Sequence, residues 1–419
     1  MFAWKRTSPP VKDLPHFGTA SPDVDAVVAI AAKAPPLPDP DGRVVGVRTT
    51  GELFAAARTA RDGDTIVLAD GVYEGVDELL IERDGVTLRG ESADRQRVIL
   101  DAGCRFTKML RVRGAKDLTV ADMTFRNCKQ YGIFMLGDSD VQRPRIHNVK
   151  FHNIWVRGVK GTKPNRIDDS ARNLLPPEQV ARIRPAGGSI RHCLFVNDTI
   201  KPFDDDGFNG DYVSGMDMMG LKDWVVADNV FVGIRGRNGY GRGAIFIWVN
   251  SEDVVAERNV IVNCDRGICF GNPSGDRIHM TGGIARNNFI AAGVNLALEM
   301  GRTRRTKVLH NTVWSHPSMR HATIDFYQGS AGGECFGNLL HNGRINCPKN
   351  LRRGHNLIGD LTGWFADPSV GDLHLTPAAS AAIAAGAPHP DAPEDFDRRQ
   401  RNDPPNLGAD DSGTGFQPV

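Results

Sequence analysis

Residues 211–272 read DYVSGMDMMGLKDWVVADNVFVGIRGRNGYGRGAIFIWVNSEDVVAERNVIVNCDRGICFGN, and this stretch contains one pattern twice. Each copy is a short run of alternating apolar residues, an Asn, a second short run, a turn and a third run that opens on Gly or Ala. Three brief strands per copy, with no helix between them, do not fit a βαβ sheet. They fit one coil of a parallel β-solenoid, whose inner face is buried only when neighbouring coils stack on it.

The composition limits the classes of partner. The 419 residues carry a net charge of +1, with 24% charged residues, so no global basic field would attract nucleic acid or a membrane surface. No run approaches the roughly 18–20 apolar residues that a membrane span needs. The seven Cys residues lack zinc-type spacing, and we expect them to be small buried residues in strands.

The chain divides into three predicted parts. Residues 1–44 are Pro-rich and aperiodic, which indicates a loose arm. TTGE at 49–52 fits a capping box that opens a short amphipathic helix, ELFAAARTAR (52–61), which we expect to cover the apolar end of the solenoid in residues 45–365. The Pro- and Ala-rich residues 366–419 predict a strand-poor wrap over the other end, with a disordered last segment.

The helix followed by DGDTIVLADGVY (62–73) and VTLRGES (86–92) is similar to the opening of right-handed parallel β-helix proteins of the pectate-lyase-like superfamily. The resemblance covers about residues 45–360. It implies an all-β fold, a single-stranded right-handed parallel β-helix with an N-terminal capping helix and side loops. The tail, with DFDRRQR (395–401) and GAD (408–410), resembles the terminal segment of many β-helix proteins.

Two kinds of column follow when the repeats are aligned on their middle strand. A large apolar residue recurs at the third position and predicts an inward stack: Phe125, Phe151, Phe195, Phe231, Ile261, Ile290, Val313 and Leu340. Asn recurs two residues after the stack, at Asn127, Asn153, Asn197, Asn263 and Asn342, and two residues before it, at Asn229, Asn259, Asn288, Asn311 and Asn338. Asn is disfavoured in strands unless its side chain bonds to backbone, so we interpret both Asn columns as structural ladders.

Three insertions interrupt the coils, at 163–188, 198–215 and 235–243, with a short helix predicted at PPEQVARIR (176–184). All three are expected between the Asn-bearing strand and the next strand, and therefore on one side of the solenoid. Loops on a rigid scaffold commonly carry function.

The strand after these loops predicts the candidate site. Its middle residues are apolar and should point inward, so its third residues should point outward. The outward residues are Phe134, Lys160, Asp217, Phe246, Cys269, Glu299 and Asp325, followed two positions later by Trp248 and Tyr327. Aromatic rings beside carboxylates and Arg favour a carbohydrate groove. The alternative is a face that the insertions cover, with the aromatic rings packed beneath them.

The leading hypothesis is a polysaccharide lyase that cleaves a uronic-acid polymer by β-elimination. A base removes the proton next to a carboxylate, and a cation neutralises the enolate that develops. The superfamily resemblance implies Lys or Arg as the base, with Ca²⁺ or basic residues as neutraliser. Here Lys160 would be the base. Candidate Ca²⁺ ligands are Asp204, Asp205, Asp206, Asp211 and Asp217, and candidate substrate-binding residues are Arg235, Arg237, Arg242, Phe246, Trp248 and Tyr327. The DDDG run also fits a solvated loop.

Two alternatives stay open. A glycoside hydrolase needs two carboxylates roughly 5–5.5 or 6.5–9.5 Å apart. Glu299 and Asp325, one rung apart at about 5 Å, fit this requirement, whereas Asp217 and Glu299, three rungs apart at about 14 Å, do not. The third candidate is a non-catalytic glycan-binding or surface scaffold solenoid.

In each case the expected partner is a polysaccharide or oligosaccharide, and the chain is expected to be a monomer. The start, MFAWKRTSPPVKD, shows no apolar core of a signal peptide, so a secreted or periplasmic location is expected only by analogy with the fold family.

Overall fold

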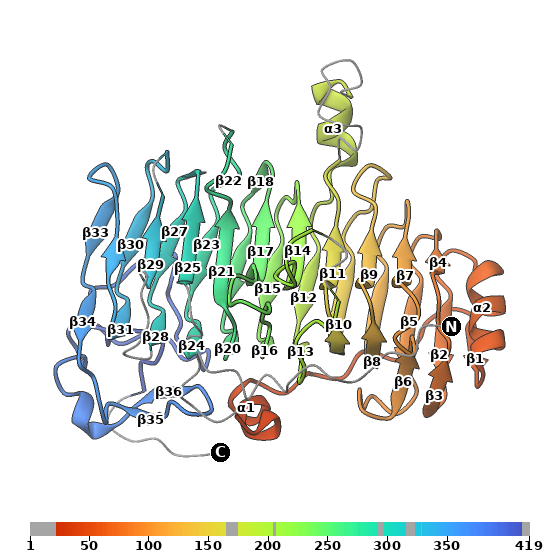
Figure 1. Cartoon of the computed structure of the whole chain (residues 1–419), viewed down its shortest axis with the longest axis horizontal. Coiled ribbons are helices and arrows are strands. Elements are labelled where there is room, and N and C mark those ends of the chain that lie inside the picture. The colour runs from red at the N-terminus through yellow and green to blue at the C-terminus, as the bar shows by residue number, and fades with distance from the viewer. Residues whose placement is uncertain are drawn as a thin grey trace.

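The chain folds into a long solenoid of parallel strands, seen in a computed structural model (Figure 1). The structure describes residues 22–164, 175–203, 207–275, 277–291, 296–315, 323–327 and 329–412. One flank is a ten-stranded parallel sheet, which we call the site sheet. Its strands are β4 (Leu79–Ile81), β7 (Lys108–Val112), β9 (Tyr131–Met135), β11 (Arg157–Gly161), β14 (Ser214–Met219), β17 (Gly243–Trp248), β21 (Arg266–Gly271), β25 (Leu296–Gly301), β29 (Ile324–Phe326) and β32 (Ile345–Asn346).

The remaining coil strands belong to one 21-stranded sheet that bends around the solenoid. One row contains β1 (Val44–Val47), β2 (Thr65–Leu68), β5 (Thr87–Gly90), β12 (Ser189–Arg191), β15 (Val225–Ala227), β19 (Val255–Glu257), β23 (Ile284–Arg286), β27 (Lys307–Leu309), β30 (Glu334–Phe336) and β33 (Arg352–Gly354). The other contains β3 (Gly71–Glu74), β6 (Val98–Asp101), β13 (Leu194–Val196), β16 (Val230–Val232), β20 (Val260–Val262), β24 (Phe289–Ala291), β28 (Thr312–Trp314), β31 (Leu339–His341) and β34 (Leu357–Gly359). The long strands β8 (Thr119–Cys128) and β10 (Arg145–Ile154) belong to both rows.

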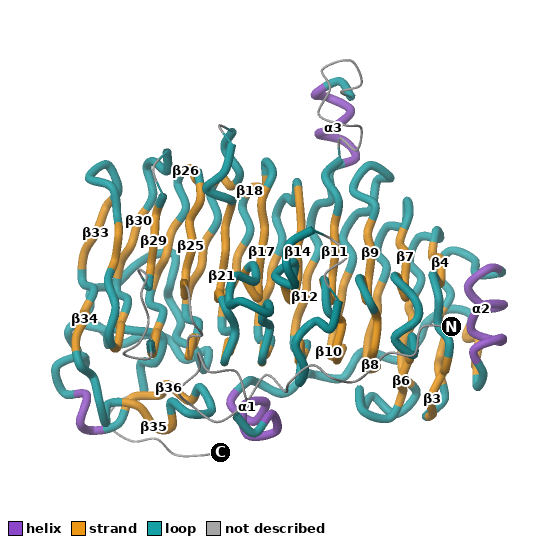
Figure 2. The backbone as a smooth tube through the Cα atoms, viewed as in Figure 1, coloured by secondary structure: helices purple, strands orange, loops and turns teal. Residues whose placement is uncertain are grey.

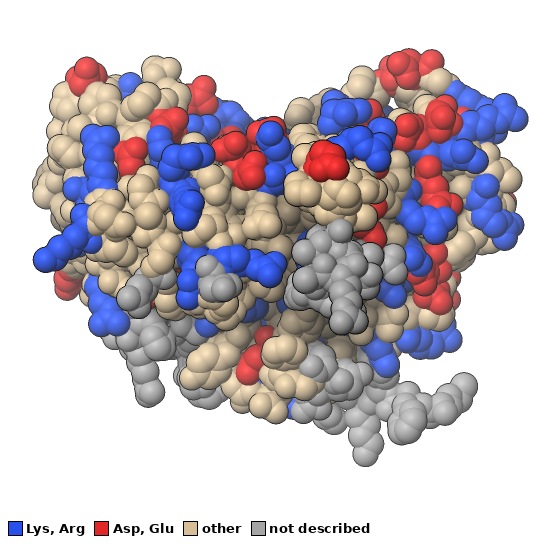
Figure 3. All heavy atoms as spheres, turned by 90° about the horizontal axis from the view of Figure 1, so that it is seen from above, with Lys and Arg blue, Asp and Glu red and all other residues tan. Residues whose placement is uncertain are grey.

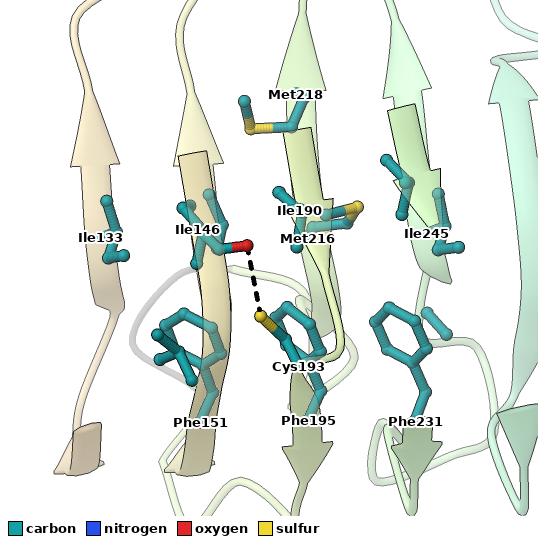
Figure 4. Close-up of a cluster of buried hydrophobic side chains, with 14 of the residues drawn as sticks. Ile133, Ile146, Phe151, Ile190, Cys193, Phe195, Met216, Met218, Phe231 and Ile245 are labelled. Carbon is teal, nitrogen blue, oxygen red and sulfur yellow. Dashed lines mark hydrogen bonds between the residues drawn. The ribbon is translucent and has the colours of Figure 1, made fainter. Parts of the chain in front are cut away.

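The predicted inward stack is confirmed. Every member of the apolar column is at most 2% exposed, and adjacent members pair in register from Phe125 to Leu340. The rings of Phe151, Phe195 and Phe231 stack in the lumen with centroids 4.7 and 4.5 Å apart (Figure 4). All the coils therefore share one apolar core. Five of the seven Cys residues are buried as expected, and Cys104 and Cys347 are partly exposed.

Only one of the two Asn columns is a ladder. The side-chain oxygens of Asn259, Asn288, Asn311 and Asn338 each accept hydrogen bonds from the backbone and side-chain nitrogens of the Asn one coil earlier. Asn356, which sequence analysis missed, extends the ladder by one coil.

The second Asn column is a turn position. Asn127, Asn153, Asn263 and Asn342 have φ between 50 and 58°, so their backbones lie in the left-handed region that Asn tolerates better than most residues. No hydrogen bond joins one Asn of this column to the next in the described residues, so the ladder interpretation was wrong here, although Asn153 Oδ1 accepts from the Asp198 amide one coil later.

Helix α2 (Thr50–Arg58) lies beside β1, β2 and β4 and buries Leu53, Ala56 and Ala57 in the core (Figure 1). Thr49 caps the helix through a hydrogen bond from the Glu52 amide to its hydroxyl. The carboxylate of Glu52 accepts from the Arg48 amide, one residue before the position that a regular capping box uses.

The described part of the predicted loose arm is ordered against the solenoid. Helix α1 (Val24–Ile30) packs on β16 and β20, and its Val27 is fully buried. Beyond the helix, backbone oxygens of the arm accept hydrogen bonds from solenoid side chains, as Ala32 does from His192 and Pro38 does from Arg89. The prediction of a loose arm was therefore wrong for residues 22–44, because an apolar helix can pack on the outer side of the coil.

The tail lies along the side of the solenoid rather than over its open end. The antiparallel pair β35 (Phe365–Asp367) and β36 (Asp372–Leu375) and the 3₁₀ helix η2 (Pro377–Ala379) form a second apolar cluster with outward residues of β13, β16, β20 and β24. Outward Val residues of these strands need a cover, and the tail supplies it together with α1. The last residues, 413–419, lie outside the described residues.

The insertions do not share one side. The first follows β11 and leads to α3 (Pro177–Ile183) and β12, so it leaves the far end of the site sheet, where α3 projects from the coil (Figure 2). The predicted helix is confirmed there. The second and third insertions connect β13 to β14 and β16 to β17, at the other end of the site sheet. A short parallel sheet of β18 (Ser251–Glu252), β22 (Met280–Thr281) and β26 (Thr303–Arg304) connects the turns beyond the site sheet.

Candidate functional site

The site sheet carries the predicted outward column in unbroken register. Adjacent strands place side by side Phe134, Lys160, Asp217, Phe246, Cys269, Glu299 and Asp325. In the next outward column, Trp248 lies beside Met219. The residues do share one flank, as their spacing predicts.

The middle of this flank is covered rather than open. Lys160 is 6% exposed, Asp217 1%, Phe246 3%, and both Cys269 and Glu299 are fully buried. Insertion residues lie on this face, with Tyr212 against Arg157 and Arg242 over Phe246, so the face is in part the covered surface that the sequence left as an alternative. Trp248 and Tyr327 remain half-buried.

Asp217 is the centre of a charged cluster on β11, β14 and β17. Its Oδ2 atom accepts hydrogen bonds from Lys160 Nζ at 2.9 Å and from Arg157 Nε at 3.0 Å. Its Oδ1 atom accepts from the indole N–H of Trp248 at 3.0 Å. Two buried cations therefore share one buried carboxylate, so the cluster carries an excess positive charge while Lys160 is protonated.

Burial and these neighbouring charges shift the pKa values of Lys160 and Asp217. Burial lowers the pKa of Lys160, and Arg157 lowers it further, while Asp217 opposes both effects. Burial alone would raise the pKa of Asp217, but Lys160 and Arg157 outweigh it and keep the carboxyl pKa below its usual value. Lys160 is thus a lysine whose environment favours loss of its proton.

Arg157 is a site residue that sequence analysis missed. It is the first residue of β11, three residues before Lys160, and it is 1% exposed. Its guanidinium carbon lies 4.1 Å from the centre of the Tyr212 ring, on the second insertion. The available signal was the Arg-x-x-Lys spacing within one strand, but only the fold of the loop shows that Tyr212 covers it.

A second charged cluster surrounds Glu299. Its two carboxylate oxygens accept from Arg242, at 2.9 Å, and from Arg266. The Arg242 guanidinium also lies over the Phe246 ring, 4.6 Å from its centre. Glu299 therefore holds two arginines in place and is enclosed by them, although the sequence suggested a catalytic acid. Asp325, on the next strand, accepts from Asn346 Nδ2 at 2.7 Å.

The candidate substrate-binding arginines differ in exposure. Arg235 is 1% exposed, and its Nε donates to buried Asp265 at 2.9 Å. Asp265 also accepts from the amides of Gly236 and Gly241, so this ion pair holds the third insertion together. Arg235 is thus held inside the third insertion, and its role in substrate binding stays a prediction. Arg237 is exposed and Arg242 is partly exposed.

Asp211 connects the second and third insertions. Its carboxylate accepts from the backbone amide and the side-chain amide of Asn238, both at 2.9 Å. The amide of Tyr240 lies 3.4 Å from the same carboxylate, and Arg237 donates its backbone N–H to Gly210 O. We call these two joined segments, residues 207–213 and 235–242, the paired loops.

The described residues of the predicted calcium set do not fit a calcium site. Asp217 faces two cations and an indole N–H, and Asp211 is used by the paired loops. A calcium ion needs several unshared oxygen ligands. Asp204, Asp205 and Asp206 lie outside the described residues. Within the described ranges, the one cluster of three potential metal ligands is Asp395, Asp397 and Asp410 in the tail.

A hollow of about 360 Å³ lies at the far end of this flank, lined by Pro273, Arg302, Tyr327 and Gly329. Burial, followed by the nearby carboxylates of Glu299 and Asp325, raises the pKa of Tyr327. From above, Lys and Arg side chains are interspersed with Asp and Glu over the surface (Figure 3). The surface charge is therefore local, as the net charge of +1 predicts.

Comparison with known proteins identifies the fold. The crystal structure of pectate lyase Pel9A superposes with a TM-score of 0.57 at 12% identity, covering 89% of this chain and 97% of that one. This chain has the pectate-lyase-like parallel β-helix fold. At 12% identity the superposition establishes the architecture of this β-helix and not its reaction.

Other solved structures superpose more loosely. A mannuronic acid-specific family 6 lyase from human gut microbiota matches at TM-score 0.42 and 14% identity, over 76% of this chain and 82% of that one. The GH136 lacto-N-biosidase from Eubacterium ramulus matches at TM-score 0.41 and 11% identity, over 76% of this chain and 68% of that one. No protein-family model and no curated protein matches this β-helix. No helix in the described ranges is long and apolar enough to cross a membrane.

Proposed function

We propose that this protein is a polysaccharide lyase that cleaves a uronic-acid-containing polysaccharide by β-elimination, with Lys160 as the base. The observation that carries the proposal is the buried cluster of Lys160, Arg157 and Asp217, in which burial lowers the lysine pKa. A lysine acts as a base only when neutral, so a lowered pKa brings it closer to working pH.

The reaction needs two things from the protein. Neutral Lys160 takes the proton from the carbon next to the uronate carboxylate, and the electron pair of that C–H bond forms the enolate. When the enolate collapses to a carbon–carbon double bond, the glycosidic C–O bond breaks and the departing oxygen takes up a proton from solvent. Positive charge fixed beside the carboxylate stabilises the enolate.

Arginine supplies that charge in our proposal. Arg157 lies on the same carboxylate as Lys160, and Arg242 and Arg266 lie further along the same sheet. With Lys160 neutral, the charges of Arg157 and Asp217 balance, whereas Arg242 and Arg266 share the single carboxylate of Glu299 and leave a net positive charge there. Calcium is not needed for this arrangement, and we expect activity to survive exhaustive treatment with a chelator, measured in the same assay as below.

Hydrolysis is less well supported by the carboxylates of this face. A glycosidase acid needs a raised pKa. The pKa of Asp217 is lowered, and both oxygens of Glu299 are ion-paired with arginines. The predicted pair of Glu299 and Asp325 lies one strand apart, but its buried member is enclosed by two guanidinium groups.

The test is the ultraviolet absorbance of unsaturated uronate ends. Purified protein is incubated with polymers of galacturonate and of mannuronate and guluronate, with and without chelator. We expect Lys160→Ala to lose at least about 100-fold in rate, because a positioned base contributes roughly 10²–10⁴. The matched control is Lys150→Ala on β10, a lysine whose pKa burial also lowers but which lies outside the site sheet.

Each outcome decides between the hypotheses. Unsaturated product lost only in Lys160→Ala supports the lyase. Reducing ends without unsaturation would replace it with a hydrolase, and saturable glycan binding without any product would replace it with a binding scaffold. Activity that disappears with chelator and returns with Ca²⁺ would overturn the arginine-based neutralisation while leaving the lyase in place.

A further inference from the structure

Two aromatic rings are exposed to solvent beside the proposed site. Four large apolar side chains in the described part of the chain are strongly exposed, and they are Val44, Val72, Phe208 and Tyr240, at 53, 50, 56 and 62%. The two aliphatic residues belong to the first coils. Both aromatic residues belong to the paired loops. Exposed aromatic rings are energetically unfavourable in water, so their location on the loops around one site points to a ligand.

The paired loops hold these rings on a fixed frame. Asp211 accepts hydrogen bonds from Asn238 and from the amide of Tyr240 itself. Gly210, at φ +83°, allows a close approach, since a Cβ atom there would lie 2.9 Å from Cβ of Arg237. Buried Asp265 fixes the other end of the loop through the amides of Gly236 and Gly241. Phe208 and Tyr240 are thus carried by two segments joined to each other.

A continuous series of contacts connects the exposed ring to the proposed base. Phe208 stacks on Tyr212, with ring centroids 4.7 Å apart and planes 19° apart. Tyr212 lies under the guanidinium of Arg157 at 4.1 Å. Arg157 donates to Asp217, which also accepts from Lys160. The ring of Phe208 therefore lies at the solvent end of the Lys160 cluster.

We propose that Phe208 and Tyr240 form a stacking platform for a pyranose ring of the acidic polysaccharide, a binding subsite on the loops beside the Lys160 cluster. The proposal rests on the function proposed above. A pyranose ring has an apolar C–H face that packs on an aromatic ring. Its carboxylate would be attracted to Arg237, which is exposed on the same loop as Tyr240. The platform binds the polymer equally in the ground and transition states, so it determines affinity and not the chemical rate.

The experiment compares the full-length protein with Phe208→Ala, Tyr240→Ala, the double variant and Val72→Ala. Val72 is the matched control, because it is similarly exposed but lies on β3. Native electrophoresis through gels containing polygalacturonate, alginate or a neutral β-glucan measures binding without requiring catalysis. Because both residues are exposed, the fold should persist, which thermal unfolding checks.

We expect each single variant to raise the dissociation constant for a uronate polymer roughly three- to tenfold, from the ~0.5–1.5 kcal/mol of one aromatic contact. KM should rise by a similar factor with kcat within about twofold, and Val72→Ala should match wild type. Unchanged binding by the double variant overturns the platform. The platform is also overturned if none of the polymer gels slows the migration of the wild-type protein.

The failure of the platform can be told apart from failure of the lyase. If a polymer retards the wild type, the double variant loses that retardation, and no unsaturated product forms, then the platform stands and the lyase falls. If the retarding polymer is the neutral glucan alone, the platform binds sugar rings but the uronate class is wrong. If unsaturated product forms at an unchanged KM in both variants, the lyase stands and the platform falls.

Discussion

At the residue scale, two neighbours act on the pKa of Lys160 in opposite directions. Burial lowers this pKa, Asp217 raises it and Arg157 lowers it. Arg157→Gln should therefore raise the pKa, and the acidic limb of kcat/KM against pH should move to higher pH. Asp217→Asn should move the limb to lower pH, because the lysine loses the carboxylate that raises its pKa.

The pH–rate profiles of both variants check this prediction. Thermal unfolding first establishes that each variant is folded, since both substitutions disturb a buried ion pair. Shifts in the same direction for both variants would show that Lys160 is not the titrating base. A purely structural cluster would reduce activity without displacing the limb at all.

The two Asn columns give a second prediction at this scale. Asn288 is fully buried, and its Oδ1 atom accepts from the backbone and side chain of Asn259, while its side-chain amide donates to Asn311. Asn288→Ala leaves several buried polar groups unpaired, at about 1–3 kcal/mol each, so the free energy of unfolding should fall by at least ~2 kcal/mol.

The matched comparison is Asn263→Gly. Asn263 is also buried, but its side-chain amide has no hydrogen-bond partner in the described structure, and its φ of 58° suits Gly. The free energy of unfolding of the Asn263→Gly variant, measured in urea, should differ from that of wild type by less than about 1 kcal/mol. Equal losses in the two variants would mean that the ladder bonds contribute nothing beyond ordinary packing.

At the scale of elements, charged groups join segments within the tail. His374 on β36 lies between Asp372, whose Oδ1 is 2.6 Å from Nδ1, and Asp397, 3.4 Å from Nε2. Burial lowers the pKa of His374, but the two carboxylates outweigh burial and raise it to about 10.

The sign of the pH dependence follows from linkage. A histidine whose folded pKa lies above its unfolded value of about 6.5 stabilises the fold fully below pH ~6.5, and this contribution declines as pH rises towards 10. The difference in Tm between wild type and His374→Gln should therefore be largest near pH 6 and should become smaller towards pH 10. A margin that widens with pH would contradict the charged state of His374.

At the scale of the whole molecule, one outer side of the coil carries apolar side chains that must be shielded from water. Val196, Val232 and Val262 point out of the coil and form one apolar cluster with α1 and the tail. Burying such a side chain contributes about 1.5–3 kcal/mol. Removing residues 366–419 should lower Tm by roughly 5 °C or more and cause association through the exposed strip.

Thermal unfolding and size-exclusion chromatography measure this effect. Removal of residues 413–419 alone is the control, since the described contacts of the tail end at Ser412. A stable, monodisperse protein without residues 366–419 would show that α1 and the solenoid alone keep this side soluble.

Much of this molecule could be predicted from repeats. The period of the strands decides which side chains point inward, so the Phe stack, the ladder and the shared flank of Lys160 and Asp217 follow from spacing alone. Arg157, Arg266 and Tyr212 could not be found this way, because their positions depend on how strand starts and insertions fold over the sheet. The same holds for Arg235, which the sequence placed in the groove and Asp265 draws into the loop.

By itself, then, the sequence determined the coil, its register and the flank on which the charged residues meet. The reason is that each side chain of a stacked strand points either into the lumen or out of the coil. Tertiary structure alone decided which of those residues face solvent. Lys160 and Asp217 are buried, Tyr212 of the paired loops lies against Arg157, and Phe208 and Tyr240 of the same loops are exposed. Such covering depends on contacts between segments that follow no period, and no alternation of polar and apolar residues encodes it.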